Sequence, residues 1–320
     1  MVGRSRGVHT KMEKRRIWLI IATGVFVVVI TVYLTSQRHL IGYLEQVSLS
    51  TAISLIAAIL LFHAFNGLLL RAVASKFNIT LTAKEWLGLP FITAMGNYIT
   101  PFSGGMLARA SYLKYRHSFP YAKFVSVIGA SYLIYFWVAG ITGIVTVALP
   151  LERPGSSGEL MLFFVGVVLI ISSCALIPAV KIPGSNRVAL ALNSAFDGWA
   201  FIRKDLPLLI RLALYTLATI LLNGTVFWLA FTTLSDGSLP FRSIFLISIF
   251  SSFSILIKIT PGNFGISEAI TTLSSGILGI GAGIGLMTSL LIRAASLIPI
   301  LILGPIFSFV LTRELTGNKK

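Results

Sequence analysis

The chain has 320 residues, of which 56% are hydrophobic and only 11% are charged. Soluble domains carry about 25% charged residues, so this composition excludes a soluble globular protein and predicts an integral membrane protein. The net charge of +16 does not predict nucleic-acid binding, because the basic residues fall in short connections between apolar runs.

Six apolar runs are long enough to cross a bilayer, which needs about 20 helical residues. The first run follows Arg15 and Arg16 and has no convincing small-residue cleavage site, so we expect it to be retained rather than removed as a signal peptide. Residues 186–204 instead place apolar side chains at helical spacing between basic ones, which predicts an amphipathic helix at the interface. The predicted spans are 17–35, 49–70, 121–149, 160–180, 206–234 and 284–312, the last interrupted at Pro299 and Gly304-Pro305.

Two related proline–glycine segments lie inside apolar surroundings. Residues 99–105 read Ile-Thr-Pro-Phe-Ser-Gly-Gly, and residues 259–265 read Ile-Thr-Pro-Gly-Asn-Phe-Gly. Proline removes a donor and glycine releases the backbone from helical geometry, so such a segment survives at membrane depth only inside protein or beside a wet cavity.

The helical stretches around these segments are too short to cross the membrane. About 14 residues lead into the first segment and span about 21 Å, against a hydrocarbon core of about 30 Å. The first segment therefore predicts a re-entrant hairpin with arms at 85–99 and 105–115, and the second has corresponding arms at 241–259 and 265–280.

The basic residues predict which side of the membrane each connection faces. With both termini cytoplasmic, 21 lysines and arginines lie on the cytoplasmic side and three on the other. The first hairpin then opens to the cytoplasm and the second to the opposite face. Each follows a span that carries Asn-Gly, at Asn66-Gly67 and Asn223-Gly224. We expect one all-α transmembrane domain, 1–320, with inverted-topology repeats at about 17–149 and 206–312, joined by the span 160–180 and the interfacial helix 186–204.

The first hairpin offers a site for an anion. Ser103, Gly104 and Gly105 begin its second arm, where free N–H groups and the helix dipole favour negative charge. Arg109 lies one turn further on, and Tyr112 could bond a headgroup. The alternative for Arg109 is that its side chain extends to the cytoplasmic interface, as Lys114 does.

The second hairpin places charge at membrane depth. Glu268 follows Gly265 by three residues, and a carboxylate in a membrane segment is a functional candidate because it is costly to bury. It could instead satisfy the helix dipole, or form a structural pair with Arg293 or Lys258. The other candidate substrate-binding residues here are Gly262, Asn263, Gly265, Arg293 and Lys258, the last of which could reach a phosphate or extend to the interface.

Both motifs resemble those of a known family. The stretch Thr-Pro-Phe-Ser-Gly-Gly-Met-Leu-Ala-Arg and the later Pro-Gly-Asn-Phe-Gly-Ile-Ser-Glu-Ala are similar to the two signature regions of the lysylphosphatidylglycerol synthase transmembrane family, over most of the chain. The resemblance implies lipid translocation in the cytoplasmic (inner) membrane of a prokaryote, with Arg109 at the basic position and Glu268 at the acidic one. The soluble synthase domain of some members does not follow here, so lipid aminoacylation is not implied.

The leading hypothesis is a flippase that moves an anionic or zwitterionic phospholipid, or a polyprenyl-phosphate-linked lipid, by its phosphate-bearing headgroup. A non-catalytic accessory subunit for a lipid- or glycan-modifying enzyme is the alternative. An intramembrane enzyme is disfavoured, because Ser103 with His63 is the one nucleophile–base pair that can be assembled. Cys174 is the single cysteine, and no metal, cofactor or catalytic residue is expected.

Overall fold

The computed structural model describes residues 47–100, 102–149, 157–176, 182–184, 187–235, 239–257 and 259–317. Within these residues the chain forms ten α-helices and no strand. The predicted first span, 17–35, lies outside them. Five helices are long and apolar enough to cross a membrane: α3 (Leu49–Lys76), α6 (Tyr121–Ala148), α7 (Ser157–Leu176), α9 (Leu206–Thr233) and α12 (Ala282–Gly317). The protein is therefore an all-α integral membrane protein, as the composition predicts.

The remaining helices are shorter, and they include the predicted hairpin arms. They are α4 (Ala83–Ile99), α5 (Gly104–His117), α8 (Arg187–Ile202), α10 (Phe241–Ser252) and α11 (Ile266–Ile277), with 3₁₀ turns at η1 (Phe253–Leu256) and η2 (Pro261–Asn263). Helix α4 begins with a capping box, in which Thr82 Oγ1 accepts from Glu85 N and Glu85 Oε2 accepts from Thr82 N.

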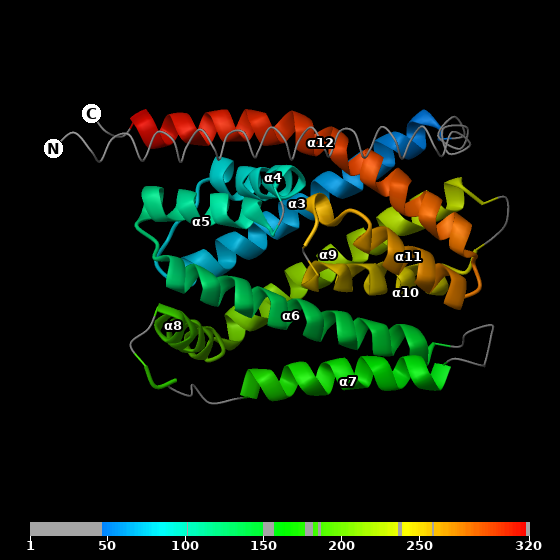
Figure 1. The fold of residues 1–320 in the computed structure, drawn as a ribbon, viewed down its shortest axis with the longest axis horizontal. Helices are drawn as coiled ribbons and strands as arrows, with labels where there is room; N and C mark the ends of the chain where they lie inside the picture. The colour runs from blue at the N-terminus through cyan, green and yellow to red at the C-terminus, as the bar shows by residue number, and fades with distance from the viewer. Residues whose placement is uncertain are drawn as a thin grey trace, which may run out of the picture.

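Two helical hairpins lie at opposite ends of the molecule's long axis (Figure 1). The α4–α5 hairpin occupies the end near α8, and the α10–α11 hairpin occupies the other end. Each hairpin directs its connecting loop towards the middle, while α6 and α12 run along most of the length and α7 lies beside the half of α6 nearer the α10–α11 hairpin. Helix α8 lies across the long axis; it coincides with the segment predicted to form an amphipathic helix.

The glycines of the two Asn-Gly pairs let the hairpins pack closely against the preceding spans. A Cβ added to Gly67 of α3 would lie 2.0 Å from the carbonyl oxygen of Trp86 in α4. A Cβ added to Gly224 of α9 would lie 2.2 Å from the Phe245 ring in α10. Corresponding glycines therefore permit the same close packing of a span on the first arm of its hairpin. The spans α3 and α9 also pack against each other.

One expected helix end and one expected helix interruption were wrong. The first arm of the second hairpin ends as an α-helix at Ser252 and tightens into η1, because the chain unwinds before the Thr260-Pro261 pair. Helix α12 continues through Pro299 and Pro305 instead of being interrupted. Proline is tolerated there because neighbouring elements support the helix: Gly304 lies against Met95 of α4 with no room for a side chain.

Candidate functional site

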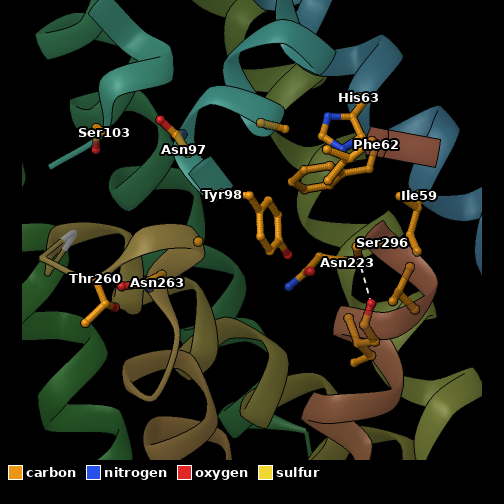
Figure 2. A pocket seen from close by; sticks show the side chains of 15 residues that line it. Ile59, Phe62, His63, Asn97, Tyr98, Ser103, Asn223, Thr260, Asn263 and Ser296 are labelled. Atoms are coloured by element: carbon orange, nitrogen blue, oxygen red, sulfur yellow. Dashed lines mark hydrogen bonds between the residues drawn. The ribbon is translucent and has the colours of Figure 1, made fainter. Parts of the chain in front are cut away.

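A cavity lined by both polar and apolar side chains lies between the two hairpin loops. Three adjoining pockets of about 260, 320 and 240 Å³ share Phe62 of α3 as a wall. Their lining combines residues of both hairpins with residues of α3, α6, α9 and α12. Figure 2 shows the first of these pockets, with the Tyr98 ring of α4 extending towards Asn223 of α9, while Asn97 of α4 lies on the side of Ser103. We call the three pockets together the central cavity.

An ion pair forms one wall of the central cavity. The Nε and Nη2 atoms of Arg293 in α12 each lie 2.5 Å from Glu268 Oε1 in α11. Both side chains are buried, with 8% and 5% of their residue surface exposed. Arg293 is one of the two partners that the sequence offered to Glu268; the other, Lys258, lies outside the described residues. The pair lines the 320 Å³ pocket, so it is both a structural contact and accessible from the cavity.

Hydrogen bonds complete the surroundings of this pair. Arg293 Nη1 donates to the Gly262 carbonyl at 2.9 Å, and Nη2 donates to Ser267 Oγ at 2.9 Å. Glu268 Oε2 accepts from the Gly265 amide at 2.7 Å, which caps α11. Gly265 has φ +84° and Gly262 has φ +59°, conformations that favour glycine. The glycines therefore bend the second loop around the Arg293 guanidinium.

The second loop contacts the first hairpin at Tyr98, which lies in the last turn of α4. A Cβ on Gly262 would lie 2.5 Å from the Tyr98 ring, so the glycine lets the second loop close on the first hairpin. The Arg293 guanidinium lies 5.7 Å from the centre of the Tyr98 ring and 5.1 Å from that of Phe264. Arg293 thus contacts both hairpins, so a change in the conformation of one hairpin can affect the other through this side chain.

Asn263 brings a polar atom into this contact that has no partner among the described residues. Its Nδ2 donates to the Ser254 carbonyl at 2.9 Å, while its buried Oδ1 accepts no hydrogen bond from the described part of the chain. Asn263 lines two of the pockets. A buried polar atom without a partner is costly, which is typical of a site that receives a ligand or water.

Arg109 turns inwards. The sequence left open whether this side chain reaches the cytoplasmic interface. In the structure its Nε donates to Thr93 Oγ1 at 2.7 Å, and the residue lines the 240 Å³ pocket. His63, Tyr132 and Tyr135 line the same pocket. No carboxylate among the described residues forms an ion pair with Arg109. The central cavity therefore contains one paired and one unpaired arginine.

The glycines of the first loop pack against their own hairpin. The Gly105 amide donates to Asn97 Oδ1 at 3.0 Å, and a Cβ there would lie 1.9 Å from the Thr93 carbonyl oxygen. A Cβ on Gly104 would lie 2.0 Å from Thr100 Oγ1. These two glycines allow α4 and α5 to approach, while Ser103 lines the cavity with φ +57°.

Tyr112 lies away from the central cavity, in a cluster that sequence reasoning missed. Its hydroxyl donates to Glu85 Oε1 at 2.8 Å, and His117 Nε2 lies 2.8 Å from the same oxygen. Burial raises the pKa of the Glu85 carboxyl, but hydrogen bonds from His117, the Thr82 amide and Tyr112 outweigh it and lower the pKa to about 2. The cluster fastens the open end of the α4–α5 hairpin.

Sequence reasoning also missed the serine- and tyrosine-rich faces of α10 and α6. Ser251, Ser252 and Ser254 line the pocket that holds the ion pair, and Tyr135 lines two of the three pockets. The signal was available, because polar residues recur at one-turn spacing inside these apolar runs, at Ser248, Ser251 and Ser254 and at Tyr132 and Tyr135. Among the described residues no three His, Cys, Asp or Glu side chains cluster as metal ligands.

Comparison with known proteins finds a family whose profile matches this chain. The profile of one protein family, described as the lysylphosphatidylglycerol synthase TM region, matches residues 17–304. No curated protein is similar to the chain at a significant level. The match covers both hairpins and the cavity between them.

Proposed function

The chain belongs to the lysylphosphatidylglycerol synthase TM family, and from this premise we propose that it moves a lipid with a phosphate-bearing headgroup across the membrane. The headgroup would pass through the central cavity, and the acyl chains would remain in the bilayer. The observation that carries the proposal is Arg109, a cavity-lining arginine without an acidic partner among the described residues.

A cation at membrane depth without a counter-ion favours an anionic ligand. Charged residues within membrane segments are expensive and usually line a substrate or ion pathway. The planar guanidinium presents a fork of donors that matches the oxygens of a phosphate. Nε of Arg109 is held by Thr93, which orients the fork towards the cavity.

The Glu268–Arg293 pair supplies a second, exchangeable position. Arg293 is already satisfied by Glu268, Ser267 and Gly262, so a phosphate can bind it only by competing with the carboxylate. Such an exchange would disturb the second loop, because Glu268 also caps α11 through Gly265. Headgroup binding and loop movement would then be coupled.

The arrangement of the hairpins supports alternating access. We interpret α3–α6 and α9–α12 as inverted repeats, each with one re-entrant hairpin, that meet at the cavity. Two loops that reach a midplane site from opposite faces can open in turn, as in other transporters built from broken helices. The Tyr98–Gly262 contact, now closed, would be the point at which they part.

The proposal includes no catalytic step. Ser103 and His63, the pair considered from the sequence, lie on different sides of the cavity (Figure 2), and no hydrogen bond joins them in the described part of the chain. A non-catalytic accessory role for a lipid-modifying enzyme is the other candidate. Its supporting result would be a purified protein that binds lipid in the cavity but moves none.

Reconstitution into proteoliposomes tests the function. We expect fluorescent phosphatidylglycerol to reach the outer leaflet, where dithionite bleaches it, faster than in protein-free vesicles. Arg109→Gln should reduce this rate to that of empty vesicles, because it removes the unpaired cation. Lys114→Gln is the matched control on the same helix, since the Lys114 ammonium lies outside over the Tyr121 ring. No movement above empty vesicles for a panel of phospholipid and polyprenyl-phosphate headgroups would contradict the proposal.

A further inference from the structure

A second, larger cavity lies away from the central one. It has a volume of about 850 Å³, within the range of ligand-binding pockets. Its walls come from α6, α7, α8, α9 and the α8–α9 turn, and none of its lining residues lines the central cavity. We call it the lateral groove; its apolar walls include Leu133, Ile134, Ile171, Leu209, Ile210 and Ala213.

One end of the lateral groove is built like a membrane interface. Trp199 Nε1 and Arg203 Nη1 both donate to the Ala175 carbonyl, at 3.0 and 3.2 Å, which fixes α8 against the end of α7. Lys204 follows at the rim and is exposed. Tryptophan and basic side chains are typical of the headgroup level, where apolar and polar surroundings meet.

Lys204 is not neutralised by the acidic residue that follows it. Asp205 follows Lys204, but its carboxylate binds Lys76 Nζ at 2.7 Å and caps α9 through the Leu208 amide. Hydrogen bonds from Lys76 and Leu208 lower the pKa of Asp205, so it stays ionised in that pair. Lys204 forms no ion pair with any carboxylate of the described residues. The groove thus combines apolar walls with a positive rim.

We propose that the lateral groove binds one anionic diacyl phospholipid, with its acyl chains along the apolar walls and its phosphate at Lys204 and Arg203. Basic pockets between transmembrane helices on the cytoplasmic side are the kind of site that holds anionic headgroups. The site is separate from the central cavity, and the inference does not depend on transport. An apolar helix of a second copy would fill the walls but would leave the basic rim without a counter-charge.

Tryptophan quenching by brominated lipids tests this inference, because Trp137 and Trp199 line the groove. Replacing Trp18, Trp86 and Trp228 by phenylalanine leaves these two as the reporters among the chain's five tryptophans. In phosphatidylcholine vesicles, dibrominated phosphatidylglycerol should quench more strongly than dibrominated phosphatidylcholine at the same mole fraction. The excess quenching gives the relative affinity of the groove for the anionic lipid.

Two variants separate the charge from the shape of the site. Lys204→Ala should lower the relative affinity about five-fold, the ratio that corresponds to about 1 kcal/mol for one basic side chain at a membrane surface. Ala213→Phe should fill the groove and remove the excess quenching. Leu214→Phe is its matched control, because Leu214 lies next to it on α9, does not line the groove and is 59% exposed.

Three results would overturn the inference. Equal quenching by the two lipids would show that the groove holds no preferred headgroup. Absence of quenching by either lipid would show that a second copy or another protein covers it. An unchanged preference in Lys204→Ala, with folding verified by circular dichroism, would remove the basic rim from the site.

Discussion

At the scale of residues, the central feature is the buried pair of Arg293 and Glu268. Removing two charges from water is costly, and a buried pair persists only when hydrogen bonds satisfy its remaining donors and acceptors. Here Ser267, Gly262 and Gly265 do so. The same set of bonds determines the conformation of the second loop, so the pair links charge to backbone geometry.

Removing one partner of this pair should destabilise the protein more than removing both partners. Glu268→Ala would leave the Arg293 guanidinium buried without a counter-charge, and we expect it to lower the free energy of unfolding by about 3–5 kcal/mol. The double variant Glu268→Ala/Arg293→Met should recover most of that loss, because no unpaired charge remains. Chemical unfolding in detergent measures both. A double variant as unstable as the single one would contradict this account of the pair.

The Glu85 cluster predicts a dependence of stability on pH. The pKa of Glu85 is lowered from 4.5 to about 2 in the folded state. A carboxyl whose folded pKa is lowered stabilises the fold above its unfolded pKa and loses that contribution as the pH falls towards the folded value. We therefore expect a loss on the order of 3 kcal/mol between about pH 5 and pH 2, and none between pH 7 and pH 5 from this group.

Comparing the wild type with Glu85→Gln measures the contribution of the carboxyl. The variant should have a lower free energy of unfolding at pH 7 and a smaller loss on acidification. Tyr112→Phe removes one of the hydrogen bonds to Glu85, which raises the folded pKa, so its loss should be smaller and should end at a higher pH. Parallel pH profiles for the wild type and Glu85→Gln would exclude the cluster as the origin of the effect.

At the scale of elements, close packing of the hairpin arms depends on glycine. A Cβ on Gly105 would lie 1.9 Å from the Thr93 carbonyl oxygen, which belongs to helix backbone and cannot move aside easily. Gly105→Ala should therefore destabilise the protein by about 1–3 kcal/mol, as overpacking does. Gly129→Ala in α6 is the control, because nothing lies within 4 Å of its added Cβ, and it should be neutral or stabilising by up to about 1 kcal/mol. Equal thermal midpoints for the two variants would contradict the packing argument.

The elements were largely predictable, whereas their contacts were not. Apolar length and basic flanks predicted five spans that the structure contains, and the proline–glycine segments predicted where two helices break. The direction of Arg109 was not predictable, since a long side chain can reach either the interface or an interior partner such as Thr93. Tyr112 was predicted as a possible headgroup contact. Its partner in the structure, Glu85, is 27 residues away in the chain, and no sequence pattern pairs the two.

At the scale of the whole molecule, the two halves contribute matching parts. The spans α3 and α9 lie together, α4 packs on α12, and α10 packs on α6. These contacts correspond when the halves are exchanged, and the hairpins lie at opposite ends of the long axis (Figure 1). This arrangement supports the central claim that we propose: the two hairpins reach one cavity from opposite faces of the membrane.

Sided cysteine labelling tests that claim most directly. In a Cys174→Ser background, Tyr115→Cys places a thiol near the open end of the first hairpin and Ile277→Cys places one at the end of the second; both positions are exposed, at 75% and 72%. In sealed vesicles of one orientation, a membrane-impermeant maleimide should label one variant before lysis and the other only after it. Labelling of both variants from the same side would contradict the account.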